Sequence, residues 1–97
     1  MNKLGLGIAI TGSGSAAPAQ ILTNDHLSQI VETSDQWINS RTGMKKRHLV
    51  KQGESLSELA AQASLGAISM AGLTPQDIDL IILATSTPDD LFGSACR

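Results

Sequence analysis

The chain has 97 residues, which is enough for one small domain, and its 41% hydrophobic and 16% charged residues are typical of a globular protein. Seven basic and nine acidic residues give a net charge of −2, which argues against a general nucleic-acid-binding protein because such proteins carry a basic excess. A single cysteine, Cys96, excludes an internal disulfide and a zinc cluster of several cysteines, and it fits a reducing cytosol. No apolar run approaches the ~20 residues that a membrane-spanning helix needs.

The first predicted element is an apolar strand, "LGLGIAIT", at residues 4–11. It is followed by "GSGSAA" at residues 12–17, which fits the G-x-G-x-x-A pattern of dinucleotide-binding turns. That motif needs a helix N-terminus directed at the pyrophosphate, and Pro18 falls within the first turns of the required helix. We therefore favour a tight surface turn, and the dinucleotide site remains a minority interpretation.

Two short helices are predicted next. Residues 22–31 form the first, with apolar side chains on one face. Thr33 or Ser34 is positioned to cap the second, and Gly43 is suited to end it in the left-handed conformation. Residues 45–50 then predict a short extended segment.

The longest predicted helix covers residues 54–72, where leucine, isoleucine and alanine recur at three- and four-residue spacing. Alanine dominates its apolar face, so we expect a neighbouring element to pack very close to it. Residues 79–86, "DLIILATS", predict a strand that is apolar on both faces, as in a parallel sheet covered by helices. The order of these elements indicates an α/β fold.

Two long strands do not make a stable sheet by themselves. The chain also stops at Arg97, directly after "LFGSAC", with no helix or strand to close the fold. We expect this chain to be a fragment of a longer protein.

The only tryptophan, Trp37, stands in a polar stretch and precedes Arg41 by four residues, so that the two share a helix face. Indole and guanidinium planes both stack on flat rings, and arginine also pairs with phosphate. Thr33 adds a hydroxyl one turn earlier. The pattern suits capture of an adenine nucleotide end, such as that of coenzyme A. The alternative is a helix that half-buries its tryptophan against the next element, and spacing alone favours this alternative slightly.

Two further features invite functional interpretations. The basic run at residues 45–48, "KKRH", is preferably interpreted as a solvated edge, and alternatively as a patch that attracts a phosphate or an acidic partner near Trp37. Cys96 has no base that could activate it, so a small packed residue is the preferred interpretation over a nucleophile.

The stretch "ETSDQWINSRTGMKKRH" at residues 32–48 resembles a signature of β-ketoacyl-acyl-carrier-protein synthase III, the condensing enzyme that starts bacterial fatty-acid synthesis. The resemblance continues collinearly through residues 54–96. It implies a thiolase-like, layered α-β-α-β-α fold in a cytoplasmic homodimer. Residues 1–97 are then the opening part of the first half, an incomplete domain, and the catalytic residues are expected beyond Arg97.

The reaction implied by the resemblance condenses acetyl-CoA with malonyl-acyl-carrier protein to acetoacetyl-acyl-carrier protein, with loss of CO2 and CoA. Coenzyme A enters as a thioester substrate, and no separate cofactor, metal, nucleic acid or membrane partner is implied.

The resemblance also assigns site residues. It implies that Trp37 and Arg41 hold the adenine of coenzyme A, with Thr33 and Thr42 at the mouth of the same pocket. Phe92 is implied to lie in a loop near the dimer interface and the acyl pocket.

Two alternatives remain beside this interpretation. One is a stand-alone module that binds coenzyme A or a nucleotide. The other is a related thiolase-fold enzyme that uses another acyl substrate. In the synthase III interpretation, we expect the 97 residues alone to have no condensing activity.

Overall fold

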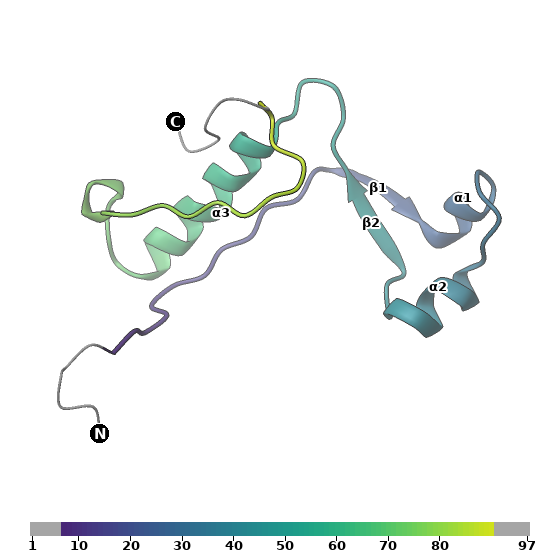
Figure 1. Ribbon diagram of the computed structural model, residues 1–97, viewed down its shortest axis with the longest axis horizontal. Coiled ribbons are helices and arrows are strands. Elements are labelled where there is room, and N and C mark those ends of the chain that lie inside the picture. The colour runs from purple at the N-terminus through teal and green to yellow at the C-terminus, as the bar shows by residue number, and fades with distance from the viewer. Residues whose placement is uncertain (1–6, 91–97) are drawn as a thin grey trace. The chain divides into compact units, whose positions relative to one another are not determined.

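The computed structural model describes residues 7–90, which fall into two compact units (Figure 1). One unit consists of residues 17–55 and contains two strands and two short helices. The other combines residues 7–16 with residues 56–90 and contains the longest helix.

The unit of residues 17–55 is organised by an antiparallel hairpin. Strand β1 (Gln20–Thr23) pairs with β2 (Lys46–Leu49), and the register places Ile21 opposite His48. The extended segment predicted at residues 45–50 is thereby confirmed. Strand β1 was not predicted, because its partner lies more than twenty residues further along the chain.

Helix α1 (Asn24–Ser28) follows β1 directly, and its cap is Thr23, whose hydroxyl accepts a hydrogen bond from the backbone N–H of His26 at 3.2 Å. The predicted helix at residues 22–31 is therefore present in shortened form. Ile30, one of the apolar residues of the predicted helix, lies beyond the end of α1 and is 71% exposed.

Helix α2 (Asp35–Thr42) is bounded by a capping residue at its start and a left-handed glycine at its end. The hydroxyl of Ser34 accepts from the backbone N–H of Trp37 at 3.1 Å, which makes Ser34 the N-cap. Gly43 follows in the left-handed conformation, with φ of 73°, where a residue with a Cβ is strained. Both predicted signals are confirmed.

Helix α3 (Leu56–Met70) confirms the predicted long helix, and a short 3-10 turn, η1 (Pro75–Asp77), follows it. The extended segment that contains Gly12 and Gly14 runs beside α3. A Cβ atom added to Gly12 would overlap the carbonyl oxygen of Ala67, and one added to Gly14 would overlap that of Ala63. The alanine-rich face therefore packs closely, as predicted, and its partner is a pair of glycines.

This packing corrects both interpretations of "GSGSAA". Residues 12–17 form neither a turn nor the start of a helix. The glycines serve the close approach of one backbone to α3, so the dinucleotide motif lacks the helix N-terminus that it requires.

The two predicted strands are not formed in the described part of the chain. Residues 7–11 and 79–86 lack strand hydrogen bonding, and their apolar side chains are open, with Ile8 99% and Ile82 84% exposed. A strand exists only when a neighbouring strand satisfies its backbone groups, and no such neighbour lies among residues 7–90.

Candidate functional site

Helix α2 presents the candidate site. Trp37 and Arg41 lie one turn apart on it, and the guanidinium carbon of Arg41 sits over the indole, 5.1 Å from the ring centroid. This is within the range of a cation–π contact. The indole is nevertheless 56% exposed, so one aromatic surface remains available to a ligand.

A hollow of about 260 Å³ lies beside the indole. It is lined by Glu32, Thr33, Ser34 and Trp37, which are consecutive or nearly so in the sequence. The Glu32 carboxylate disfavours a phosphate in this hollow and accepts hydrogen bonds from an amino group. The hollow therefore suits the amino-bearing edge of a base better than a phosphate.

The structure brings three of the predicted coenzyme A residues together, namely Trp37, Arg41 and Thr33. Thr42 is used differently. Its hydroxyl donates to the carbonyl of Ile38 at 2.8 Å and accepts from the backbone N–H of Met44 at 3.1 Å. Thr42 thus secures the end of α2. Phe92 lies outside the described residues.

The stacking geometry limits how a ring could bind. A flat ring held between the indole and the guanidinium needs a separation of roughly 7 Å, twice the ~3.5 Å contact distance of stacked planes. The 5.1 Å observed leaves no such space. A base therefore either stacks on the opposite face of the indole or displaces Arg41.

The four residues of the basic run at 45–48 do not share one role. Arg47 donates through Nη1 to the carbonyl of Leu22 at 3.2 Å, and its Nη2 lies 2.5 Å from the side-chain oxygen of Asn24. Nδ1 of His48 is 2.6 Å from the carbonyl oxygen of Pro18. The two lysines of the run are exposed, so two of its four residues hold the hairpin together and two face solvent.

Sequence reasoning missed Asn24, which is 1% exposed. In the sequence Asn24 is one of two adjacent residues, with Thr23, that can cap a helix, and Thr23 performs that role. An asparagine at the start of a helix is usually interpreted as its cap. The local sequence around Asn24 does not indicate that its side chain instead bonds to residues far along the chain.

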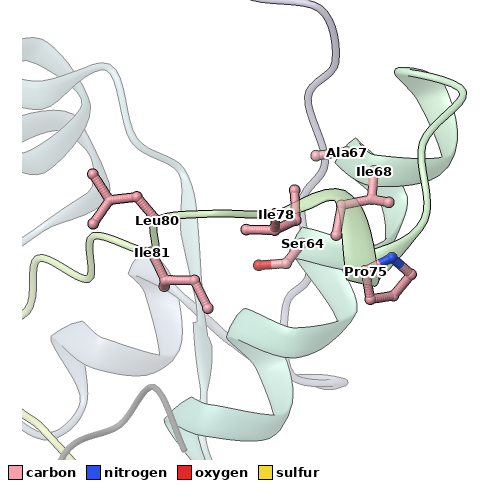
Figure 2. Close-up of a pocket in the computed structure, with 7 residues that line it drawn as sticks. All are labelled: Ser64, Ala67, Ile68, Pro75, Ile78, Leu80 and Ile81. Carbon is pink, nitrogen blue, oxygen red and sulfur yellow. The ribbon is translucent and has the colours of Figure 1, made fainter.

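A second hollow, of about 340 Å³, lies between α3 and the segment that follows η1 (Figure 2). Figure 2 shows Ile68, Ile78, Leu80 and Ile81 around it, with the Ser64 hydroxyl as its polar side-chain group. One hydroxyl is too little to orient a polar ligand. We therefore do not assign this hollow as a site.

Residues 7–90 contain neither a candidate metal site nor a candidate membrane span. No group of three or more histidine, cysteine, aspartate or glutamate side chains is arranged to hold a metal ion. None of the helices there is both long enough and apolar enough to cross a membrane.

The chain is similar along its whole length to known condensing enzymes. It is 65% identical over 97 residues to "Beta-ketoacyl-[acyl-carrier-protein] synthase III" of Microcystis aeruginosa, and the match covers 29% of that protein. The chain therefore spans less than a third of the length of the curated relatives that it matches. No family model matches the chain.

Solved structures agree with this similarity. The crystal structure of 3-oxoacyl-[acyl-carrier-protein] synthase III from Aquifex aeolicus matches 92% of this chain and 29% of its own, with a TM-score of 0.83 and 46% identity. The priming β-ketosynthase of the R1128 polyketide pathway matches 87% of this chain and 28% of its own, with a TM-score of 0.68 and 26% identity. These matches confirm the resemblance to synthase III and the predicted thiolase-like fold class, of which the described residues form a small mixed helix and strand portion.

Proposed function

We propose that this chain is the opening part of a β-ketoacyl-acyl-carrier-protein synthase III that works as a cytoplasmic homodimer. The complete enzyme would condense acetyl-CoA with malonyl-acyl-carrier protein, giving acetoacetyl-acyl-carrier protein, CO2 and CoA. The similarity to synthases III over all 97 residues is the observation that carries this proposal.

In this proposal the chain contributes part of the coenzyme A site and none of the catalytic residues. The adenine stacks on the open face of Trp37, with its amino edge toward the hollow lined by Glu32 and Thr33. Arg41 holds the opposite face of the indole and directs its charge toward the phosphates. Coenzyme A is a substrate here, and the reaction needs no separate cofactor.

A related enzyme with a different acyl substrate is the second candidate. It is favoured by the structural match to the priming β-ketosynthase, at a TM-score of 0.68. The stand-alone binding module finds less support, because Ile8 and Ile82 are open to solvent in the described chain and call for covering elements.

The test uses the complete protein that carries this sequence, with acetyl-CoA and malonyl-acyl-carrier protein as substrates and mass spectrometry of the carrier protein as the readout. We expect acetoacetyl-carrier protein to form. Loss of base stacking in Trp37→Ala is worth about 1–3 kcal/mol, so KM for acetyl-CoA should rise about 5- to 150-fold while kcat changes little. Trp37→Phe should retain part of the affinity, and the exposed Lys51→Ala should match the wild type.

The possible outcomes separate the candidates. Condensation that prefers longer or branched acyl-CoA over acetyl-CoA would favour the second enzyme. Coenzyme A binding without any condensation would favour the binding module. An unchanged KM in Trp37→Ala would remove α2 from the coenzyme A site.

A further inference from the structure

Asn24 is the buried polar side chain among residues 7–90, and its amide is fully used. Its Nδ2 donates to Oδ1 of Asp35 at 2.8 Å and to the carbonyl oxygen of Met44 at 2.7 Å. Its Oδ1 accepts from Nη2 of Arg47 at 2.5 Å. Two acceptors lie on the nitrogen side and a cationic donor lies on the oxygen side, so the orientation of the amide is determined by its neighbours.

These partners place Asn24 at both ends of α2. Asp35 is the first residue of the helix, and Met44 follows directly after the Gly43 that ends it. One amide nitrogen therefore holds the start of the helix and the chain that leaves it. The backbone N–H of Asn24 also donates to the carbonyl of Lys45 at 3.0 Å, next to Met44.

Within residues 17–55, α2 buries little apolar surface. Ile38 is the buried apolar side chain of the helix, at 9% exposure, whereas the larger Trp37 is mostly open. Apolar packing through one side chain leaves a short helix free to tilt or to shift along its axis. The hydrogen bonds of Asn24 remove that freedom.

The chemistry requires an amide at this position. A carboxylate would meet the Asp35 carboxylate and the Met44 carbonyl without a proton to share, while an alkyl group would leave Asp35 and Arg47 without their buried partner. Asparagine supplies two donors and an acceptor, and thereby links an anion and a cation through one neutral group.

We propose that Asn24, with Asp35 and Arg47 as its partners, is a positioning residue for coenzyme A recognition. By holding both ends of α2, it sets the orientation of the Trp37 and Arg41 side chains. This proposal rests on the proposed function where coenzyme A is concerned, but the positioning of Trp37 can be measured without any ligand.

The experiment uses the complete protein labelled with 5-fluorotryptophan, and Trp37→Phe identifies the ¹⁹F resonance of Trp37. Four variants are compared with the wild type: Asn24→Ala, Asn24→Asp, Asp35→Asn, and the double exchange Asn24→Asp with Asp35→Asn. Asn39→Asp is the matched control, since it introduces the same charge as Asn24→Asp, but on α2 itself and at a side chain with no hydrogen bond within residues 7–90. Circular dichroism confirms that each variant is folded.

We expect the Trp37 resonance to shift or broaden in Asn24→Ala and Asn24→Asp, and to stay in place in Asn39→Asp. Affinity for coenzyme A, measured by calorimetry, should fall about tenfold or more in both Asn24 variants, with KM rising and kcat at saturation changing less than about twofold. Asp35→Asn should have a smaller effect, because its amide oxygen still accepts from Asn24.

The double exchange provides the rescue. The amide introduced at position 35 would donate to the carboxylate introduced at position 24, and that carboxylate would pair with Arg47. The resonance and the affinity should therefore return toward wild type relative to Asn24→Asp alone. An unmoved Trp37 resonance in folded Asn24→Ala, or a double exchange no better than Asn24→Asp, would overturn the proposal. A resonance that moves and recovers while Trp37→Ala leaves coenzyme A affinity unchanged would instead refute the coenzyme A assignment and leave the positioning role established.

Discussion

Asp89 accepts hydrogen bonds from both the backbone N–H and the hydroxyl of Ser57, although 32 residues separate them. Its other carboxylate oxygen accepts from the backbone N–H of Leu56 at 2.9 Å. Leu56 and Ser57 are the first two residues of α3. The free backbone N–H groups and the dipole at the start of a helix favour an anion there. One side chain from the segment after residue 86 thereby satisfies the start of the longest helix.

The first prediction concerns the pH dependence of this contact. The hydrogen bonds from the Ser57 side chain, the Ser57 backbone and the Leu56 backbone, in this order, lower the pKa of Asp89 from 3.8. A lowered pKa in the folded state means that the contact contributes its full stability above pH 3.8 and loses it as the pH falls through the lower folded pKa. Asp89→Asn should therefore unfold at a lower temperature than wild type near pH 7.

The measurement is thermal unfolding by circular dichroism of wild type and Asp89→Asn between pH 7 and pH 2. The gap between the two Tm values should be constant from pH 7 to about pH 5 and should close below pH 3.8. Asp79→Asn, which removes a charge from an exposed side chain, serves as the control. A gap that stays open down to pH 2 would show that the carboxylate charge is not what stabilises α3.

The second prediction concerns the glycines against α3. Gly12→Ala and Gly14→Ala force a methyl group onto the backbone of Ala67 and Ala63, where no flexible side chain can give way. Overpacking of this kind costs about 1–3 kcal/mol. Gly7→Ala is the matched control, since nothing lies within 4 Å of its added Cβ. Urea unfolding should show both variants destabilised and the control within about 0.5 kcal/mol of wild type; equal midpoints for all three would contradict the close packing.

The third prediction tests the end of α2. Gly43 has φ of 73°, and a residue with a Cβ is destabilised by about 1–2 kcal/mol in that conformation. Gly43→Ala should lower the free energy of unfolding by about that amount, measured by urea denaturation. Gly43→Asn should cost less, because asparagine tolerates the left-handed region better. If neither Gly43→Ala nor Gly43→Asn lowered the free energy of unfolding, the helix would have to end in another conformation.

These residues show where sequence reasoning succeeds and where it stops. Gly43, and Ser34 as one of two candidate caps, were identified correctly because a cap and a left-handed stop depend on the residue itself and on neighbours within one turn. The bonds of Asn24 and Asp89 were not foreseen, because the partners of Asn24 lie 11, 20 and 23 residues away and Ser57 lies 32 residues from Asp89. The glycines of "GSGSAA" were recognised as special, but the reason, contact with α3, is a tertiary one.

At the candidate site, too, local spacing predicted some features and could not predict others. The spacing of Trp37 and Arg41 correctly predicted a shared helix face, and the cation–π contact confirms their proximity. Spacing could not reveal that the guanidinium already covers one indole face. Nor could it show that the Thr42 hydroxyl is held by Ile38 and Met44.

The fourth prediction uses that covered face. If the base stacks on the open face and Arg41 meets phosphate, Arg41→Ala removes a charge-assisted hydrogen bond worth about 1.5–3 kcal/mol. Coenzyme A affinity of the complete protein, measured by calorimetry, should then fall about tenfold or more, and the loss should shrink as salt rises. Arg41→Lys should keep part of the affinity, because it keeps the charge without the planar fork.

The opposite binding mode makes the opposite prediction. A base that must displace Arg41 to reach the indole competes with the contact seen at 5.1 Å, so removing the guanidinium would free that face and tighten binding. Adenosine, which lacks phosphates, separates the two modes further. On the open face its affinity should be nearly the same in wild type and Arg41→Ala. On the covered face it should bind Arg41→Ala more tightly, by up to the ~0.5–1 kcal/mol of an exposed cation–π contact.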